Sequence, residues 1–366
     1  MVEDKMSRQD AILNLKTLTW SYPRVRTKAD LNDEEGLTLL PNGNVLTVDC
    51  YTDYLFGVIN HYPPDPTNSE IFDPRTKTWT SGGSTINSLT DRQTFEMGIA
   101  MLRPDGTVFA TGTQGYASIY NTQTQTWSVG PRLPTSPRGK QFTTADAAAA
   151  LLPSGNVLFS ASGGVIVKGH DDHMPLHFFE FDGTGYFAEP STQNAKNEAS
   201  YSVNLLPLPN GSVLAVDRTK DVEIYAPDES APNQAWAPVV TNVKHRLTPG
   251  ATYKIRGVRF NGMSQACAFG DEAQCATNYP LVRITNVASG HVFYCRTHDH
   301  TSMAVASPDN VATFFDVPAN QEAGDSILEL VANGIASKPV NVRVAHPSAR
   351  TSYAEELLQG MSPRER

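Results

Sequence analysis

A short phrase recurs four times in the first part of the chain, at 40–46, 103–109, 152–158 and 208–214. Each copy consists of an apolar run, a turn dipeptide (Asn-Gly, Asp-Gly or Ser-Gly) and a second apolar run. Such dipeptides favour two-residue β-hairpin turns, because both turn positions require positive φ. The phrase therefore predicts four hairpins of one kind.

A second phrase, which ends on an aromatic residue, follows each of these hairpins. Clear copies lie at 72–79 and 120–127, weaker ones at 181–187 and 225–236, and an orphan copy at 15–20 opens the chain. All four tryptophans are thereby expected at one structural position. A period of about 50 residues with four strands is typical of propeller blades, which stack radially because one sheet cannot bury both faces alone. We expect an all-β propeller of about five blades over residues 1–243.

Beyond about residue 243 the repeats stop and short alternating strands take their place. Seven candidate strands lie within about 100 residues, which is the size of an immunoglobulin-like β-sandwich. They are 252–259, 281–287, 291–297, 302–306, 311–317, 326–332 and 339–344. We expect this sandwich over 244–346 and a C-terminal tail over 347–366, with a short helix at 353–358.

Composition and charge restrict the partners. The 366 residues carry a formal net charge of -9 and no cluster of Lys and Arg, which argues against nucleic acid or an anionic membrane as partner. The N-terminus lacks the apolar segment of a signal peptide and no stretch approaches transmembrane length, so a cytoplasmic protein is expected. The four cysteines fit reduced packing residues, although Cys267 and Cys275 are close enough to pair in a secreted protein.

The order of the two predicted domains and several local motifs resemble the galactose oxidase and glyoxal oxidase family, in which a kelch-type propeller precedes an immunoglobulin-like domain. The motifs lie at 95–101, 201–206, 284–287, 296–298, 314–318 and 330–339. The resemblance implies a copper ion on the propeller axis. In that family two tyrosines and a histidine from inner strand starts bind the copper, together with a histidine on a hairpin from the last domain. One tyrosine is cross-linked to a cysteine and carries the radical.

Only part of this copper site has a counterpart here. The hairpin histidine matches His298 and the axial tyrosine matches Tyr201, whereas Ser202 replaces the second histidine and Glu96 replaces the cysteine. Copper selectivity needs that second nitrogen ligand, and the radical needs the cysteine–tyrosine pair. The resemblance therefore extends to architecture, and the copper-radical chemistry is not retained.

The position of the cross-linked tyrosine is ambiguous. It falls on Lys140 if Arg138-Gly139 anchors the match, and on Asp146 if the distance to the hairpin turn at 154–155 does. Neither alternative restores the redox pair. We therefore expect no metal and no other cofactor.

Polar residues stand where the innermost strands of the expected blades begin, eight or nine residues before each hairpin turn. They are Asp33, Glu34, Glu35, Glu96, Asp146, Tyr201 and Ser202, with His298 and His300 expected from the last domain. Carboxylates at such positions need solvent or a ligand, because their burial otherwise costs several kcal/mol. A wet polar channel along the axis is the alternative to a functional site. The residues assigned to catalysis are Glu96, Asp146, Tyr201, His298, His300 and Lys140, and substrate binding is assigned to Glu34, Glu35 and Ser202.

Three other segments are expected to contribute to substrate binding on the same face. Arg138 adds a positive charge, and Tyr54 and His61 lie in a long loop over 51–66, a length common for lids. That loop could instead pack on the blade rim. His170 and His173 belong to a loop that could bind a divalent metal or form a solvated lip.

Carboxylates beside a histidine and a tyrosine are suited to proton transfer, because burial raises a carboxyl pKa toward neutrality. We therefore expect a cofactor-independent tailoring enzyme that dehydrates, eliminates or cyclises a small organic molecule. The resemblance includes a fungal biosynthetic branch with hetero-Diels–Alderases, which places such chemistry in secondary metabolism. The alternatives are a non-catalytic kelch module that binds protein or glycan, and a metal-dependent oxidase-like enzyme. Oligomeric state is left open.

Overall fold

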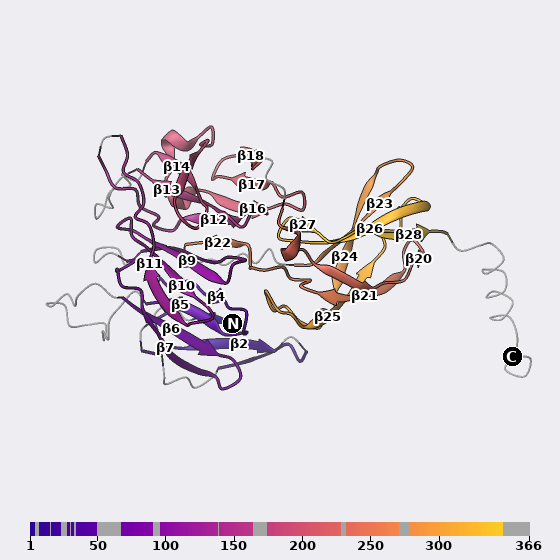
Figure 1. The fold of residues 1–366 in the computed structure, drawn as a ribbon, viewed down its shortest axis with the longest axis horizontal. Helices are drawn as coiled ribbons and strands as arrows, with labels where there is room; N and C mark the ends of the chain where they lie inside the picture. The colour runs from indigo at the N-terminus through magenta and orange to yellow at the C-terminus, as the bar shows by residue number, and fades with distance from the viewer. Residues whose placement is uncertain are drawn as a thin grey trace, which may run out of the picture.

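The computed structural model describes residues 1–3, 7–14, 16–22, 28–29, 31–32, 34–49, 67–90, 96–137, 139–163, 174–227, 232–270 and 279–346. Within these ranges the regular structure consists of β-strands and three short 3-10 helices. Figure 1 shows a blade-bearing part, coloured indigo to pink, and a sandwich, coloured orange to yellow.

Five sheets follow one another in the blade-bearing part. The N-terminal sheet contains β1 (Val2–Glu3), β2 (Asp10–Asn14) and β3 (Thr19–Ser21). The first blade contains β4 (Thr38–Leu39), β5 (Val45–Val48), β6 (Asn68–Asp73) and β7 (Thr78–Ser84). The second blade contains β8 (Met97–Leu102), β9 (Thr107–Gly112), β10 (Ala117–Asn121) and β11 (Thr126–Val129). The third blade contains β12 (Ala148–Leu151), β13 (Val157–Ser162), β14 (Leu176–Phe181) and β15 (Tyr186–Glu189), and the fourth contains β16 (Asn204–Pro207), β17 (Val213–Val216) and β18 (Val222–Tyr225).

The strands of each blade are antiparallel and follow chain order from the inner to the outer edge. Inner strands of successive blades are neighbours: β4 contacts β8, β8 contacts β12, and β12 contacts β16. The expected all-β architecture, a propeller of about five blades followed by a sandwich, is confirmed. The N-terminal sheet packs on the first blade, where Trp79 Nε1 donates to Asp10 Oδ2 at 2.8 Å.

The four repeated hairpins share one turn, which differs from the expected one. In the first copy the Gly43 amide donates to Leu40 O at 2.9 Å and the Leu40 amide donates to Asn44 O at 2.8 Å. Only the glycine of this turn has positive φ, at 86°, so the turn is type I with a left-handed residue after it. Pro41 explains why the expected turn does not form. Its ring fixes φ near -65° at the first central position, where the expected turn requires positive φ. Gly106, Gly155 and Gly211 repeat this geometry.

The outer hairpins also share a turn. Leu18, Lys77 and Gln125 all have positive φ, between 52° and 59°, and their amides donate to the carbonyls four residues earlier. The orphan copy near the N-terminus therefore forms the same hairpin as the others.

Three of the four tryptophans occupy one equivalent position, because Trp20, Trp79 and Trp127 each lie two residues after the positive-φ residue of an outer hairpin. Trp79 and Trp127 lie buried on β7 and β11, while Trp20 lies on β3 with 49% of its surface exposed. Trp236 ends the 3-10 helix η3 (Gln234–Trp236) and lies over Gly155, so it belongs to no strand. The other two 3-10 helices are η1 (Ala195–Asn197) and η2 (Ser200–Ser202).

The sandwich is built from nine strands. They are β19 (Val239–Asn242), β20 (Arg246–Leu247), β21 (Thr252–Val258), β23 (Leu281–Asn286), β24 (Val292–His298), β25 (Asn310–Asp316), β26 (Gly324–Ala332), β27 (Ile335–Ala336) and β28 (Val340–Val344). Strand β24 belongs to both layers, because its first half pairs with β23 and its last three residues pair with β25. Buried side chains such as Ile255, Ile284 and Phe315 fill the space between the layers.

Six of the seven expected sandwich strands are present, and 302–306 is not a strand. The β19 strand already pairs with β21, so the sandwich begins before the expected boundary at 243. The helix expected at 353–358 lies outside the described residues.

One short strand leaves the sandwich and joins the blades. β22 (Cys267–Phe269) pairs with the inner strand β12 and also contacts β8 and β16. Figure 1 shows β22 beside β12, apart from the other strands of its domain. Residues from the second domain therefore complete the centre of the propeller.

Candidate active site

Three carboxylates from three successive blades meet at the centre of the propeller. One oxygen each of Glu34, Glu96 and Asp146 lies within 4.8 Å of the other two. We call these three residues the acidic cluster. Each stands just before an inner strand, and the adjacency of those strands brings them together. The expected convergence of inner strand starts thus holds for these three residues, while their roles stay predictions.

Two members of the acidic cluster have a left-handed backbone. Glu34 has φ 54° and Asp146 has φ 47°, which costs energy in residues that carry a Cβ. The Asp146 amide donates to Met97 O at 2.9 Å, which ties the third blade to the second. Such strain persists only where the surrounding structure enforces it, and it concentrates at functional sites.

Glu35, expected to bind substrate, is instead part of the interior of the first blade. Its Oε2 accepts from Lys28 Nζ at 2.8 Å and from Thr47 Oγ1 at 2.8 Å. The same ammonium donates to Glu70 Oε2 at 2.8 Å, and the side chain of Lys28 is fully buried. Burial alone would lower the Lys28 pKa, but Glu35, Asp49 and Glu70 outweigh it and raise the pKa above its usual range.

The two histidines of the last domain are bonded within the sandwich and do not join the acidic cluster. His298 shares hydrogen bonds with Asp299 Oδ2 at 2.7 Å and Asp316 Oδ1 at 3.2 Å. These carboxylates raise the His298 pKa. His300 contacts Thr313 Oγ1 at 2.8 Å through Nδ1. In the described part of the chain, no imidazole or thiol completes a ligand group with the three carboxylates.

A cavity of about 330 Å³ opens beside the inner strand start of the fourth blade. Its lining residues are Met174, Asn194, Asn197, Glu198, Ala199, Tyr201, Ser202, Arg218 and Thr219. We call it the Tyr201 cavity. Two predicted site residues, Tyr201 and Ser202, are therefore present in one wall. Its volume lies in the range of small-molecule sites.

Ser200 connects this cavity to the acidic cluster. Its hydroxyl donates to Ala145 O at 2.5 Å, and its amide donates to Ser162 Oγ at 2.7 Å. Ala145 precedes Asp146, and Ser200 precedes Tyr201. Buried hydroxyls thus fix η2 against the start of the third blade, and the two sites are adjacent.

One lining residue of the Tyr201 cavity, Glu198, has a strongly raised pKa, and the sequence pattern did not identify it. Only 7% of its surface is exposed. Burial raises its pKa to about 7, assisted by a hydrogen bond and charge repulsion from Asp217. Glu223 adds a smaller repulsion. A carboxyl group with this pKa can donate and accept a proton near neutral pH.

Asp217 remains ionised because its own hydrogen bonds stabilise the anion. Asp217 Oδ1 accepts from Thr219 Oγ1 at 2.6 Å and from the Thr219 amide at 2.7 Å, and Oδ2 accepts from Asn194 Nδ2 at 2.9 Å. These bonds lower its pKa to about 2. Between about pH 2 and about pH 7 the Glu198–Asp217 pair therefore holds one proton, which resides on Glu198.

The geometry of a β-hairpin predicts that these two residues lie close together. Asn204 pairs with Val216, so residues just before β16 and just after β17 lie at the same end of the hairpin. Asp217 follows β17 directly, and Glu198 lies shortly before β16, between η1 and η2. The 3-10 turns of this connection carry no clear sequence signal, so the position of Glu198 was missed.

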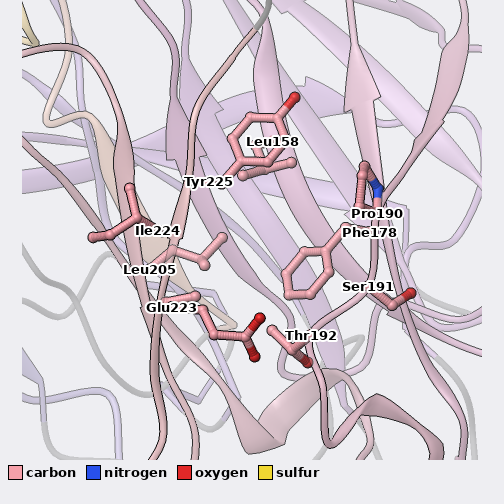
Figure 2. A pocket seen from close by; sticks show the side chains of 10 residues that line it. Leu158, Phe178, Pro190, Ser191, Thr192, Leu205, Glu223, Ile224 and Tyr225 are labelled. Atoms are coloured by element: carbon pink, nitrogen blue, oxygen red, sulfur yellow. The ribbon is translucent and has the colours of Figure 1, made fainter.

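A second, smaller hollow lies between the third and fourth blades. Its volume is about 100 Å³. Figure 2 shows the side chains that line it, among them Leu158, Phe178 and Leu205. Its one carboxylate, Glu223, accepts from the Gln193 amide at 2.9 Å. With few polar groups and a small volume, this hollow is suited to packing more than to chemistry.

The remaining predicted site residues lie elsewhere. Lys140 is in an exposed turn between β11 and β12, where its carbonyl accepts from the Ser136 amide at 2.7 Å. Predicted substrate-binding residues outside the described part of the chain are Arg138, Tyr54, His61, His170 and His173.

The cysteines also differ from expectation. Cys267 is disulfide-bonded, so its assignment as a reduced packing residue is wrong. Cys295 is free and buried, and burial raises its pKa to about 12. Cys50 and Cys275 lie outside the described residues. In the described ranges no helix is long and apolar enough to cross a membrane.

No family model matches the chain, and no curated protein matches it. Solved structures with partial similarity include a fungal alcohol oxidase of the AA5 family in complex with copper, at 13% identity and a TM-score of 0.35 over 93% of this chain and 81% of that one. The extracellular domain of a hybrid two-component system from B. thetaiotaomicron is 10% identical, with a TM-score of 0.34 over 88% and 40%. The tricorn protease is 8% identical, with a TM-score of 0.24 over 93% and 35%. We transfer no function from similarities this low.

Proposed function

We propose that the chain is an enzyme that transfers protons to and from a small organic molecule in the Tyr201 cavity. The observation that carries this proposal is the position of Glu198, whose carboxyl group has a pKa of about 7 and lines the cavity together with Tyr201 and Arg218. A proton donor with a pKa near the working pH, next to a phenol, provides general acid–base catalysis.

The reaction type that fits this equipment is loss of water or another leaving group, with or without ring closure. Glu198 in its protonated form would protonate the departing oxygen, and its conjugate base would then remove a proton from the substrate. Tyr201 would orient the reacting oxygen. A dehydration that sets up a hetero-Diels–Alder cyclisation in secondary metabolism is the specific form of this proposal.

The groups at the inner strand starts do not fit a copper-radical centre. The donors that converge there are the carboxylate oxygens of Glu34, Glu96 and Asp146, whereas copper favours nitrogen and sulfur ligands. His298 and His300 are bonded within the sandwich. The proposal therefore assigns no step to a metal or another cofactor.

The location of the protein is a further part of the proposal. A cytoplasmic enzyme was expected from the sequence, but the disulfide at Cys267 favours an oxidising compartment, because cytosolic thiols are kept reduced. Small organic molecules are the proposed partners in either compartment, and nucleic acids and membranes are not.

A substrate screen tests the catalytic proposal. Purified protein is incubated at pH 6 to 7 with β-hydroxy ketones and β-hydroxy acids, and loss of water is followed by mass spectrometry. Turnover should fall by about 10²–10⁴-fold in Glu198→Gln and Tyr201→Phe. Tyr186→Phe is the control, because it removes the same hydroxyl group at a residue that does not line the cavity. The Tyr186 hydroxyl donates to Pro131 O at 2.7 Å. Absence of water loss from every compound, or undiminished turnover in both cavity variants, would contradict the proposal.

A further inference from the structure

The guanidinium of Arg218 is an available cation at the Tyr201 cavity. It lies over the Tyr201 ring, 5.0 Å from the centroid, and its side chain is exposed. Among the described residues, none of the ion pairs involves Arg218. Stacking on an aromatic ring fixes the plane of a guanidinium and leaves its edge free to bind a carboxylate.

In the described part of the chain, the neighbouring acidic groups form no ion pair with this cation, although Asp217 keeps its negative charge. The adjacent Asp217 is engaged by Thr219 and Asn194. Glu198 faces the charges of Asp217 and Glu223 and is uncharged below about pH 7. Glu223 itself accepts from the Gln193 amide and lines the other hollow. Among the described lining residues of the Tyr201 cavity, Arg218 is therefore a cation without an ion pair, and Glu198 is a neutral acid below about pH 7.

We infer that the Tyr201 cavity binds small organic acids, with Arg218 as the anchor for the substrate carboxylate and Glu198 as the proton donor next to it. The role of Glu198 rests on the proposed function, whereas the anion preference rests on Arg218 alone. A planar guanidinium and a carboxylate form two parallel charge-assisted hydrogen bonds, which also orient the rest of the molecule. An anchored substrate would present its leaving group to the Glu198 carboxyl.

The preference for an anion should depend on pH. When Glu198 loses its proton near pH 7, the cavity gains a negative charge that repels the substrate carboxylate. Affinity for an anionic ligand should therefore decline as the pH rises through 7, while affinity for a neutral analogue of the same shape should stay constant.

Calorimetric titration with benzoate and benzamide tests this inference. At pH 6 benzoate should bind the intact protein at least about tenfold more tightly than benzamide, and Arg218→Gln should remove that difference. The matched control is Arg132→Gln, because Arg132 lies over the Tyr116 ring at 4.4 Å, away from the cavity, and should leave benzoate binding unchanged. Glu198→Gln should abolish the decline in benzoate affinity above pH 7.

Three results would overturn the inference. The first is equal affinity for benzoate and benzamide, and the second is no saturable binding of either. The third is an equal effect of the Arg218 and Arg132 substitutions on benzoate binding. Because these are binding measurements, a negative result leaves the dehydration screen as an independent test of the proposed function.

Discussion

Gly270, at the end of the strand that the sandwich contributes to the propeller, lies in direct contact with Asp146. A Cβ on Gly270 would come within 2.6 Å of Asp146 Cα and 3.0 Å of Asp146 Oδ1. The Gly270 amide also donates to Ala147 O at 2.6 Å. The second domain therefore supports the backbone that positions one member of the acidic cluster.

Gly270→Ala should destabilise the protein and displace Asp146. Gly43→Ala is the control, because Gly43 also has positive φ, at 86°, but has nothing within 4 Å of its would-be Cβ. Backbone strain should cost about 1–2 kcal/mol in either variant, and the clash should add about 1–3 kcal/mol for Gly270 alone. Urea denaturation measures the free energy of unfolding of both variants. Equal losses of stability would show that the contact between Gly270 and Asp146 is absent.

Lys28→Met should be strongly destabilising. The substitution leaves Glu35 and Glu70 buried without their cation, a situation that costs about 3–5 kcal/mol. Arg75→Ala breaks an ion pair with Asp73 in which the arginine side chain is 77% exposed, and should cost less than about 1 kcal/mol. Similar losses in the free energy of unfolding for the two variants would contradict a buried ion-pair network around Lys28.

Glu96→Gln should destabilise the protein less than Glu35→Gln does at neutral pH, because it also relieves repulsion among three carboxylates that have one oxygen each within 4.8 Å of one another. Glu35→Gln, the same chemical change at a carboxylate that pairs with Lys28, should destabilise it. Thermal unfolding in the presence of a chelator compares the two. A melting temperature that falls as far for Glu96→Gln as for Glu35→Gln would contradict relief of repulsion in the acidic cluster.

The stability of the protein should decline between pH 4.5 and 7 because of Glu198. Its folded-state pKa of about 7 exceeds the ordinary value of 4.5, so the folded state holds this proton more tightly than the unfolded state does. The contribution of Glu198 to the free energy of unfolding is therefore complete below pH 4.5 and is lost as the pH rises through 7. The loss amounts to about 3 kcal/mol at most. Glu198→Gln should flatten this part of the curve, as measured by denaturation at several pH values. A decline that is identical in the variant would assign the effect to other groups.

The sequence predicted the architecture well because the repeated hairpins carry strong local signals. Gly43 and its equivalents mark the inner hairpins, and the turn at Lys77 marks an outer one. Counting back from these turns placed Glu34, Glu96 and Asp146 at converging strand starts, which the structure shows. The dipeptide alone predicts the wrong turn type, because the preceding proline fixes the first central residue at negative φ.

Contacts between distant segments were not predictable in the same way. Glu35 and Glu34 are adjacent in sequence, yet one pairs with Lys28 and the other joins the acidic cluster, and no periodicity in the sequence encodes that division. The insertion of β22 beside β12 depends on a pairing between residues more than 100 positions apart. The resemblance places His298 at the axis, whereas the structure bonds it to Asp316 within the sandwich.

A carbon-detected NMR titration of the Glu198 carboxyl group, with labelled glutamate and with Glu198→Gln to assign the signal, tests the central claim most directly. The group should titrate near pH 7 in the intact protein. In Asp217→Asn its pKa should fall toward 4.5, because the neighbouring anion is removed. Titration of Glu198 near 4.5 in the unaltered protein would mean that the cavity holds no proton donor at neutral pH and would contradict the proposed acid–base site.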